Sequence, residues 1–362
     1  MPLQERKKLK NIKRIFEPYK NRKNFIRLDR NEDPIGWSSK FFKDWVNSIS
    51  QYDLTAYSDS DALVKSISHW QKVKKDQIYI TAGSDAAIKN IFEVFVEPNY
   101  KIILQEPSWR MYEVYSLIYG AKMIKINYDS NLNLDLKNLI KLINEEKPKI
   151  VVIANPNQPT GTIIKASIIE KIIQVSKENK CLIIIDEAYY LFTKQTSYKM
   201  IEKYNNLIIV RTFSKAFGLA GLRIGYCIAN SKIIKKLKIL RPVTDSNSLG
   251  LKAAEHSIKN INYNKLRIKL IIEGRNWLIK VLKKNNIETF ESHTNFILLK
   301  CKNKKSALQI IKMTKQKGYL IKGPFDKYPL KNMIRISIGP INIMRKFWKD
   351  CNDIFTRVNI EL

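Results

Sequence analysis

The chain has 362 residues, of which 44% are hydrophobic and 10% aromatic, and its formal net charge at pH 7 is +32. This composition excludes a disordered chain and predicts a globular protein with room for one large core or two ordinary ones. No apolar run approaches the ~20 residues that a membrane span requires, so we expect no membrane segment.

The cysteines and histidines exclude two further classes of protein. The four cysteines are far apart and form no Cys-x-x-Cys pair, which argues against a disulfide framework or a zinc site. This usage fits a reducing compartment, and we expect a cytoplasmic protein. The three histidines show no ligand spacing, so we expect no metal. The lysines are spread along the whole chain, which indicates solvated faces that attract anionic substrates and no specific nucleic-acid site.

The N-terminal half begins with a short strand at residues 25–28 that ends in a polar turn containing Asn31. Helices are predicted over 38–50 and 61–72, with a turn containing Tyr57 between them. Gln77 to Thr81 alternate as a strand and run into Gly83, Ser84 and Asp85, which open a helix. Small residues at a helix start leave backbone N–H groups that point outward, so this turn predicts an anion site.

Three further strands are expected at residues 101–105, 120–128 and 149–154. The first runs into a Pro-Ser-Trp turn containing Trp109, and the third ends in the loop Asn-Pro-Asn-Gln-Pro-Thr-Gly, which includes Asn157 and Gln158. A helix over 166–179 returns the chain to an apolar strand that ends at Asp186, with Tyr189 three residues later. A fully apolar strand with an aspartate at its carboxyl end is typical of a buried parallel strand that faces a ligand.

The stretch 207–226 places a lysine at the end of another apolar strand. Leu207 to Val210 lead into Ser214 and Lys215, and a turn of small residues separates Lys215 from Arg223. Burial of an ammonium ion is expensive, and covalent chemistry is one good reason for it, because a lysine that loses its proton easily can form a Schiff base with an aldehyde cofactor. The hydroxyl of Ser214 and the guanidinium of Arg223 would suit a phosphate group on that cofactor.

The C-terminal part changes in character after residue 230. Residues 231–240 and 248–285 are predicted as long helical segments, followed by a strand at 294–299 and a helix over 305–316. A last strand at 332–339 carries Arg335, and a helix over 342–358 closes the chain. We therefore predict an α/β fold with a mostly parallel mixed sheet flanked by helices in a large domain, residues 45–240. A smaller α+β domain would comprise residues 1–44 and 241–362.

Five segments together resemble one enzyme family. Residues 207–226 closely resemble the lysine segment of fold-type I pyridoxal-phosphate (PLP) aminotransferases of class I/II, and are most similar to the histidinol-phosphate aminotransferase branch. The segments at 25–34, 155–161, 186–189 and 333–339 resemble segments of that family in the same order. The resemblance implies the PLP-dependent transferase fold type I, PLP as cofactor, and a homodimer with shared active sites.

The resemblance also implies a role for each of the residues singled out above. Lys215 would carry PLP as a Schiff base and act as general base, Asp186 would pair with the pyridine nitrogen, and Tyr189 would donate to the phenolic oxygen. The other cofactor-binding residues would be Gly83, Ser84, Asp85, Ser214 and Arg223 at the phosphate, Tyr57 reaching the phosphate across the dimer, Trp109 stacking on the ring with Tyr112 as a second choice, and Gln158 or Asn157 at the phenolic oxygen. Arg335 would bind the substrate carboxylate, and Asn31 would lie near the substrate.

The implied activity is transfer of an amino group between an amino acid, or an amino-alcohol phosphate such as histidinol phosphate, and a 2-oxo acid. The histidinol-phosphate branch often carries a further arginine, suited to a substrate phosphate, where this chain has Lys322. This difference argues against histidinol phosphate specifically, so the donor and the acceptor stay open. One alternative is a PLP-dependent decarboxylase of a phosphorylated amino acid, similar to threonine-phosphate decarboxylase. The other is a polyanion-binding protein on a degenerate scaffold, against which the set of Asp186, Lys215 and Arg223 argues.

Overall fold

The computed structural model describes residue 12 and residues 22–240, 242 and 245–360. The sequence assigns the segment 1–44 to the small domain, and residues 1–11 and 13–21 of this segment lie outside the described residues. Within the described residues, no helix combines the length and the apolar character that a bilayer crossing requires.

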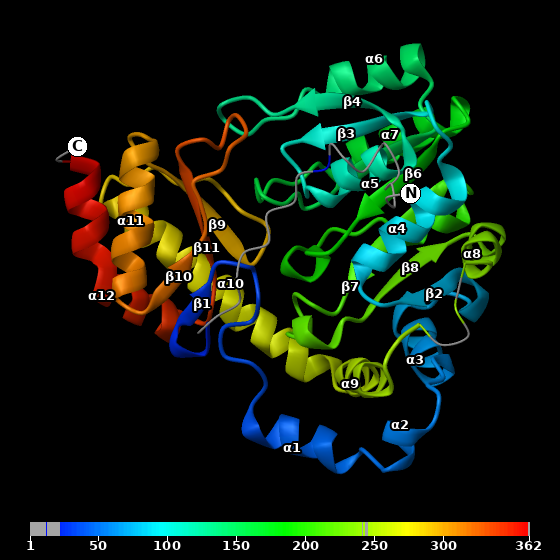
Figure 1. Ribbon diagram of the computed structural model, residues 1–362, viewed down its shortest axis with the longest axis horizontal. Helices are drawn as coiled ribbons and strands as arrows, with labels where there is room; N and C mark the ends of the chain where they lie inside the picture. Colours follow the sequence, from blue (N-terminus) through cyan, green and yellow to red (C-terminus); the bar gives the residue numbers. More distant parts are fainter. Residues whose placement is uncertain (1–11, 13–21, 241, 243–244, 361–362) are drawn as a thin grey trace, which may run out of the picture.

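The larger part of the protein is built on a seven-stranded sheet with the order β2-β8-β7-β6-β5-β3-β4. Neighbouring strands are parallel, except that β8 runs antiparallel to both β2 and β7. The predicted α/β fold with a mostly parallel mixed sheet is thereby confirmed (Figure 1). The strands are β2 (Ile78–Thr81), β3 (Lys101–Glu106), β4 (Lys122–Asn127), β5 (Ile150–Ala154), β6 (Leu182–Asp186), β7 (Leu207–Thr212) and β8 (Gly225–Ala229).

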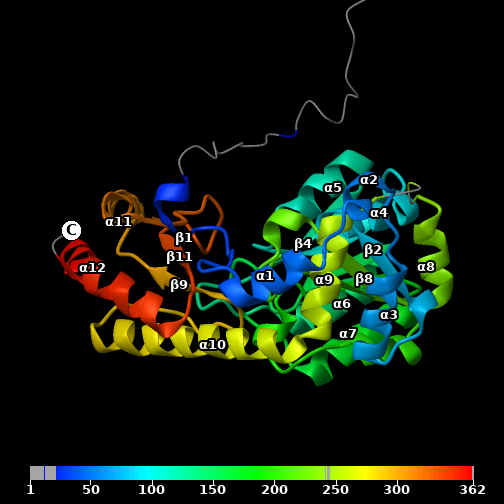
Figure 2. The ribbon, with the colours of Figure 1, turned by 90° about the horizontal axis from the view of Figure 1, so that it is seen from below.

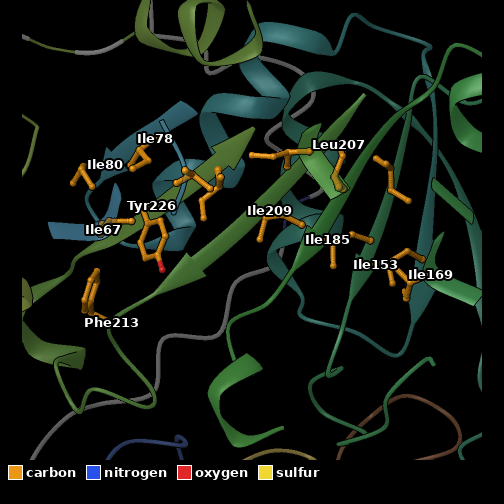
Figure 3. Close-up of a cluster of buried hydrophobic side chains, with 14 of the residues drawn as sticks. Ile67, Ile78, Ile80, Ile153, Ile169, Ile185, Leu207, Ile209, Phe213 and Tyr226 are labelled. Carbon is orange, nitrogen blue, oxygen red and sulfur yellow. The ribbon is translucent and has the colours of Figure 1, made fainter. Parts of the chain in front are cut away.

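Helices cover both faces of this sheet because its central strands are apolar on both sides. Every residue of β5 and β7 is buried, as expected of parallel strands between two helical layers. Alternate residues point to opposite faces, so Ile185 and Ile209 belong to one core and Ile184 to the other. Figure 3 shows the first of these cores, which is packed with isoleucine side chains.

The first core contains residues of α3 (Asp61–Gln71), α6 (Leu136–Glu146), α7 (Ala166–Glu178) and α9 (Ser248–Lys259). The second contains residues of α4 (Ser84–Phe95), α5 (Met111–Tyr119) and α8 (Ser231–Lys238). Two helices, α1 (Ser39–Asn47) and α2 (Tyr52–Thr55), precede α3 along the chain. The helical layers leave the carboxyl ends of the parallel strands accessible to a ligand.

A smaller unit with its own core is formed by the C-terminal part of the chain and β1 (Ile26–Leu28). In it β9 (Phe296–Lys300) pairs antiparallel with β11 (Met333–Ser337), and β1 pairs parallel with β10 (Tyr319–Ile321). The helices α11 (Lys304–Gln316) and α12 (Ile341–Ile360) belong here, and α10 (Ile261–Lys284) extends from this unit to α9 (Figure 2). The domain limits at residues 45–240 and 241–362 stay a prediction.

Candidate active site

A cavity of about 310 Å³ lies at the carboxyl ends of β5, β6 and β7, where Ala154, Asp186 and Thr212 line its wall. Ligands of α/β proteins bind at this edge of the sheet, because the loops that follow the carboxyl ends of the parallel strands meet there. Most of the residues predicted from the sequence line this one cavity: Asn31, Ser84, Asp85, Trp109, Gln158, Asp186, Tyr189, Ser214, Lys215, Arg223 and Arg335.

Asp186 is the acidic group of the cavity and sits at the last position of β6. Its carboxylate accepts a hydrogen bond from the Tyr112 hydroxyl and one of 2.9 Å from the backbone N–H of Ala188. Burial raises the pKa of Asp186 to about 6, although the hydrogen bond from Tyr112 opposes the shift. The carboxylate is therefore mostly ionised at pH 7 and can pair with a cationic ring nitrogen.

Lys215 follows β7 and approaches the same cavity from the next strand of the sheet. Its Nζ donates to the carbonyl oxygen of Arg30 at 3.2 Å. Burial, and then the positive charge of Arg335, lower the pKa of Lys215 to about 8. A lysine with a lowered pKa supplies a neutral, nucleophilic amine near physiological pH, which is the property that attack on a carbonyl carbon requires.

The N-terminus of α4 and Arg223 form an anion-binding corner, which we define as Gly83, Ser84, Asp85, Ser214 and Arg223. Gly83 has φ +86°, and a Cβ atom there would lie 2.6 Å from Nη2 of Arg223. Nη1 of Arg223 lies 3.2 Å from the Ser214 hydroxyl, and Nη2 lies 3.3 Å from a carboxylate oxygen of Asp85. Helix N–H groups, a hydroxyl and a guanidinium are together the donors that bind a phosphate. The chemistry of this donor set fits the phosphate of PLP.

The opposite part of the cavity wall comes from the N-terminal segment and the small unit. Asn31, at φ +56°, donates from Nδ2 to the Tyr189 hydroxyl at 2.8 Å, and its backbone N–H donates to Ser337 Oγ at 2.8 Å. Burial raises the pKa of Tyr189 to about 12, so this hydroxyl keeps its proton and can donate it to a ligand. Arg335 donates from Nη2 to the carbonyl oxygen of Asp29 at 2.8 Å.

Three of the predicted residues do not line the cavity. Gly83 contributes backbone at the anion-binding corner. Asn157 is fully buried, and its Nδ2 donates to Pro107 O at 3.0 Å and to Thr160 Oγ1 at 2.8 Å, so its amide shapes the loop while Gln158 faces the cavity. Tyr57 is 88% exposed and lies on the outer surface.

Tyr112 and Arg30 are among the lining residues whose place the sequence did not give. Tyr112 was a second choice for stacking, whereas its hydroxyl lies against Asp186 and its ring stands edge-on to Trp109 at 5.3 Å. Trp109 precedes α5 and Tyr112 lies in the first turn of that helix, so helical periodicity did not predict their relative placement. Arg30 lines the cavity from the turn before Asn31, and no motif indicated it.

No candidate metal site is present in the part of the chain that the structure describes. No group of histidine, cysteine, aspartate and glutamate side chains there is arranged to hold an ion. The four cysteines are free and buried, and burial raises the pKa of Cys227 above its usual range.

The fold and the cavity define an α/β enzyme that holds a lysine, a carboxylate and an anion-binding corner at one sheet edge. The chain belongs to the aminotransferase class I and II family, whose model matches residues 23–347. The family assignment made from the sequence motifs is thereby confirmed.

Several relatives share one name. The histidinol-phosphate aminotransferase of Clostridium novyi is 34% identical over 329 residues, which are 90% of this chain and 90% of that protein. The protein of the same name from Caldanaerobacter subterraneus is 32% identical over 93% of both chains. The crystal structure of the histidinol-phosphate aminotransferase from Clostridium acetobutylicum has a TM-score of 0.81 at 26% identity, covering 93% of this chain and all of that one. The enzyme from Sinorhizobium meliloti, solved in complex with pyridoxal-5'-phosphate, has a TM-score of 0.83 at 23% identity and covers 91% of this chain and 90% of that one.

Proposed function

We propose that this PLP-dependent aminotransferase transfers the amino group of an amino-alcohol phosphate, with histidinol phosphate as the first candidate, to a 2-oxo acid. One observation carries the proposal: Lys215 and Asp186 line one cavity that ends in an anion-binding corner. The shared name of relatives that match about nine-tenths of the chain supports the substrate class.

Each part of the cavity suits one part of the cofactor. The anion-binding corner would hold the phosphate, Asp186 would hold the ring nitrogen, and Trp109 would contact the ring face. When bound, PLP supplies an aldehyde that takes up the amino group and a ring that withdraws electrons from the substrate carbon.

The chain's own residues would orient these groups and move the proton. Tyr112 donates to Asp186 and fixes the direction of the carboxylate. Asn31 donates to the Tyr189 hydroxyl, which is then free to donate its own proton to an oxygen of the cofactor. Lys215, whose pKa is lowered to about 8, would remove the proton from the substrate carbon next to nitrogen.

Arg335 lines the cavity, and a second basic residue, Lys322, pairs with the backbone of Arg335. Arg335 and Lys322 are directly opposite each other, and their backbones exchange hydrogen bonds of 2.6 and 3.0 Å. Residues opposite each other in an antiparallel pair project to the same face, so Lys322 adds positive charge beside Arg335. Two cations suit a phosphate better than a single carboxylate, which favours a phosphorylated substrate.

The assembly also belongs to this proposal. The exposed Tyr57 suits a contact with the phosphate in a second copy of the chain, and we propose a homodimer with shared sites. The cytoplasmic location and the two-domain limits stay predictions.

The absorption spectrum of the purified protein tests the proposal. We expect the yellow colour of bound PLP and its bleaching by the true amino donor, in a screen of histidinol phosphate, glutamate and phosphothreonine. Lys215→Ala should abolish both the colour change and turnover, because no other lysine among the described residues lines the cavity. Turnover by the Lys215→Ala protein would refute the role of the lysine, and release of CO2 from phosphothreonine would favour the decarboxylase.

A further inference from the structure

The loop 322–332 connects β10 to β11 in the small unit and reaches the large sheet. Lys327 in this loop places Nζ 2.9 Å from a carboxylate oxygen of Glu106 and 2.7 Å from one of Glu113. Glu106 is the last residue of β3, and Glu113 belongs to α5. The two ion pairs therefore join the small unit to the large one.

A second lysine completes a four-charge cluster of Glu106, Glu113, Lys125 and Lys327. Nζ of Lys125 lies 3.3 Å from Glu106 and 3.0 Å from Glu113. The two glutamate side chains are only 15% and 24% exposed, so solvent screens these pairs less than isolated surface pairs. Burial alone would raise the pKa of Glu113, yet the hydrogen bonds from Lys327 and Lys125 lower it.

An apolar contact joins the same two units beside the charges. Leu132 follows β4, is 3% exposed, and packs in one cluster with Leu298, Leu330 and Met333, with Phe325 at its edge. Figure 1 shows the orange loop 322–332 next to the loop that follows β4. Ionic and apolar contacts thus hold one loop by two different kinds of force.

This loop also forms the surroundings of Arg335. The centre of the Phe325 ring lies 5.9 Å from the Arg335 guanidinium, and the centre of the Phe296 ring lies 5.3 Å from the same guanidinium. Lys322, at the start of the loop, pairs with the Arg335 backbone. On the large-unit side, Glu106 comes three residues before Trp109, which lines the cavity. The cluster therefore connects the two walls of the cavity.

We propose that Lys327 is a positioning residue, which holds the 322–332 loop on Glu106 and Glu113 and thereby keeps Arg335 in place to bind the anionic group of the substrate. The substrate link rests on the proposed function of Arg335. The attachment of the loop does not depend on that function, since the ion pairs and the apolar contacts themselves show the attachment.

Hydrogen exchange of the PLP-loaded protein, without substrate, tests the attachment. In Lys327→Met we expect amide exchange over 322–332 to become about fivefold faster, while Lys327→Arg keeps the wild-type rate. About 1 M salt should have a similar effect on the wild-type protein, because screening weakens half-buried pairs. Leu132→Ala should also speed exchange over 322–332. Exchange in this variant should still respond to salt, because the substitution leaves the charges in place.

Kinetics on the same variants test the positioning role. In Lys327→Met we expect the KM of the amino donor to rise about fivefold with kcat changed less than about twofold, because the two partly buried ion pairs of Lys327 are lost. The matched control is Lys203→Met, which removes a 2.7 Å ion pair with Glu170 between residues that do not line the cavity.

Three possible results distinguish a failure of the positioning role of Lys327 from a failure of the proposed function. Unchanged exchange over 322–332 in Lys327→Met overturns the proposal, and so does faster exchange with an unchanged KM. If exchange responds as expected but the wild-type protein turns over no amino donor, the proposed function fails while the attachment of the loop stands.

Discussion

Replacing Gly83 by alanine is the sharpest test of the anion-binding corner. Gly83 precedes α4 with φ +86° and ψ 164°, a backbone conformation that is almost confined to glycine. An added Cβ would also lie 2.6 Å from Nη2 of Arg223. The substitution therefore strains the backbone and pushes the guanidinium away from the place where the cofactor phosphate would bind.

The two effects have different sizes and different readouts. Backbone strain of this kind costs about 1–3 kcal/mol and lowers the free energy of unfolding. Loss of one hydrogen bond between Arg223 and the phosphate costs about 1.5–3 kcal/mol, which corresponds to a Kd for PLP about 10- to 150-fold higher. Absorbance titration of the cofactor-free protein measures the second effect, and thermal unfolding without PLP measures the first.

Gly221 supplies the matched control because it lies two residues before Arg223. A Cβ atom on Gly221 meets no other atom within 4 Å, and its φ is not in the left-handed region. We therefore expect Gly221→Ala to bind PLP as the wild-type protein does. The reasoning is refuted if Gly83→Ala also binds PLP with the wild-type Kd.

Two further substitutions test the electrostatics around the cavity. Arg335→Gln removes a positive charge that, after burial, lowers the pKa of Lys215 to about 8, so that pKa should move up toward 10.5. Borohydride trapping of an aldehyde on the cofactor-free protein should then have its midpoint at higher pH, and an unchanged midpoint would contradict the assignment. Glu187→Gln breaks the 2.8 Å ion pair with Arg211, whose side chain is fully buried, and should lower the free energy of unfolding by about 3–5 kcal/mol. Denaturant unfolding measures this, and a loss below about 1 kcal/mol would show that the pair is not needed.

The sequence predicts the centre of the site because its signals are local. Asp186 and Lys215 each follow an apolar run, and such runs form neighbouring parallel strands whose carboxyl ends meet at one edge of the sheet. The strands β6 and β7 are paired in the structure, so two separate motifs become one cavity wall.

Contacts between distant segments could not be predicted in this way. The pairing of β1 with β10 joins residues 26–28 to 319–321, and no strand was predicted at the latter. The predicted helical segment 248–285 is divided at Asn260 into α9 and α10, because Asn260 adopts a non-helical backbone between them. The contact of Tyr112 with Asp186 likewise depends on how α5 packs on the sheet. Tertiary packing, which periodicity does not encode, decides all three.

Burial shifts the pKa values of the two central groups, Asp186 and Lys215, in opposite directions. Burial disfavours charge of either sign, and it raises the pKa of Asp186 to about 6 while lowering that of Lys215 to about 8. Apolar side chains at both positions would avoid this cost. The chain nevertheless carries a carboxylate and an amine there, within reach of one ligand. The protein thus keeps two charged groups at a cost to its stability. Groups that change protonation near neutral pH are required for proton transfer and for covalent capture of a carbonyl compound.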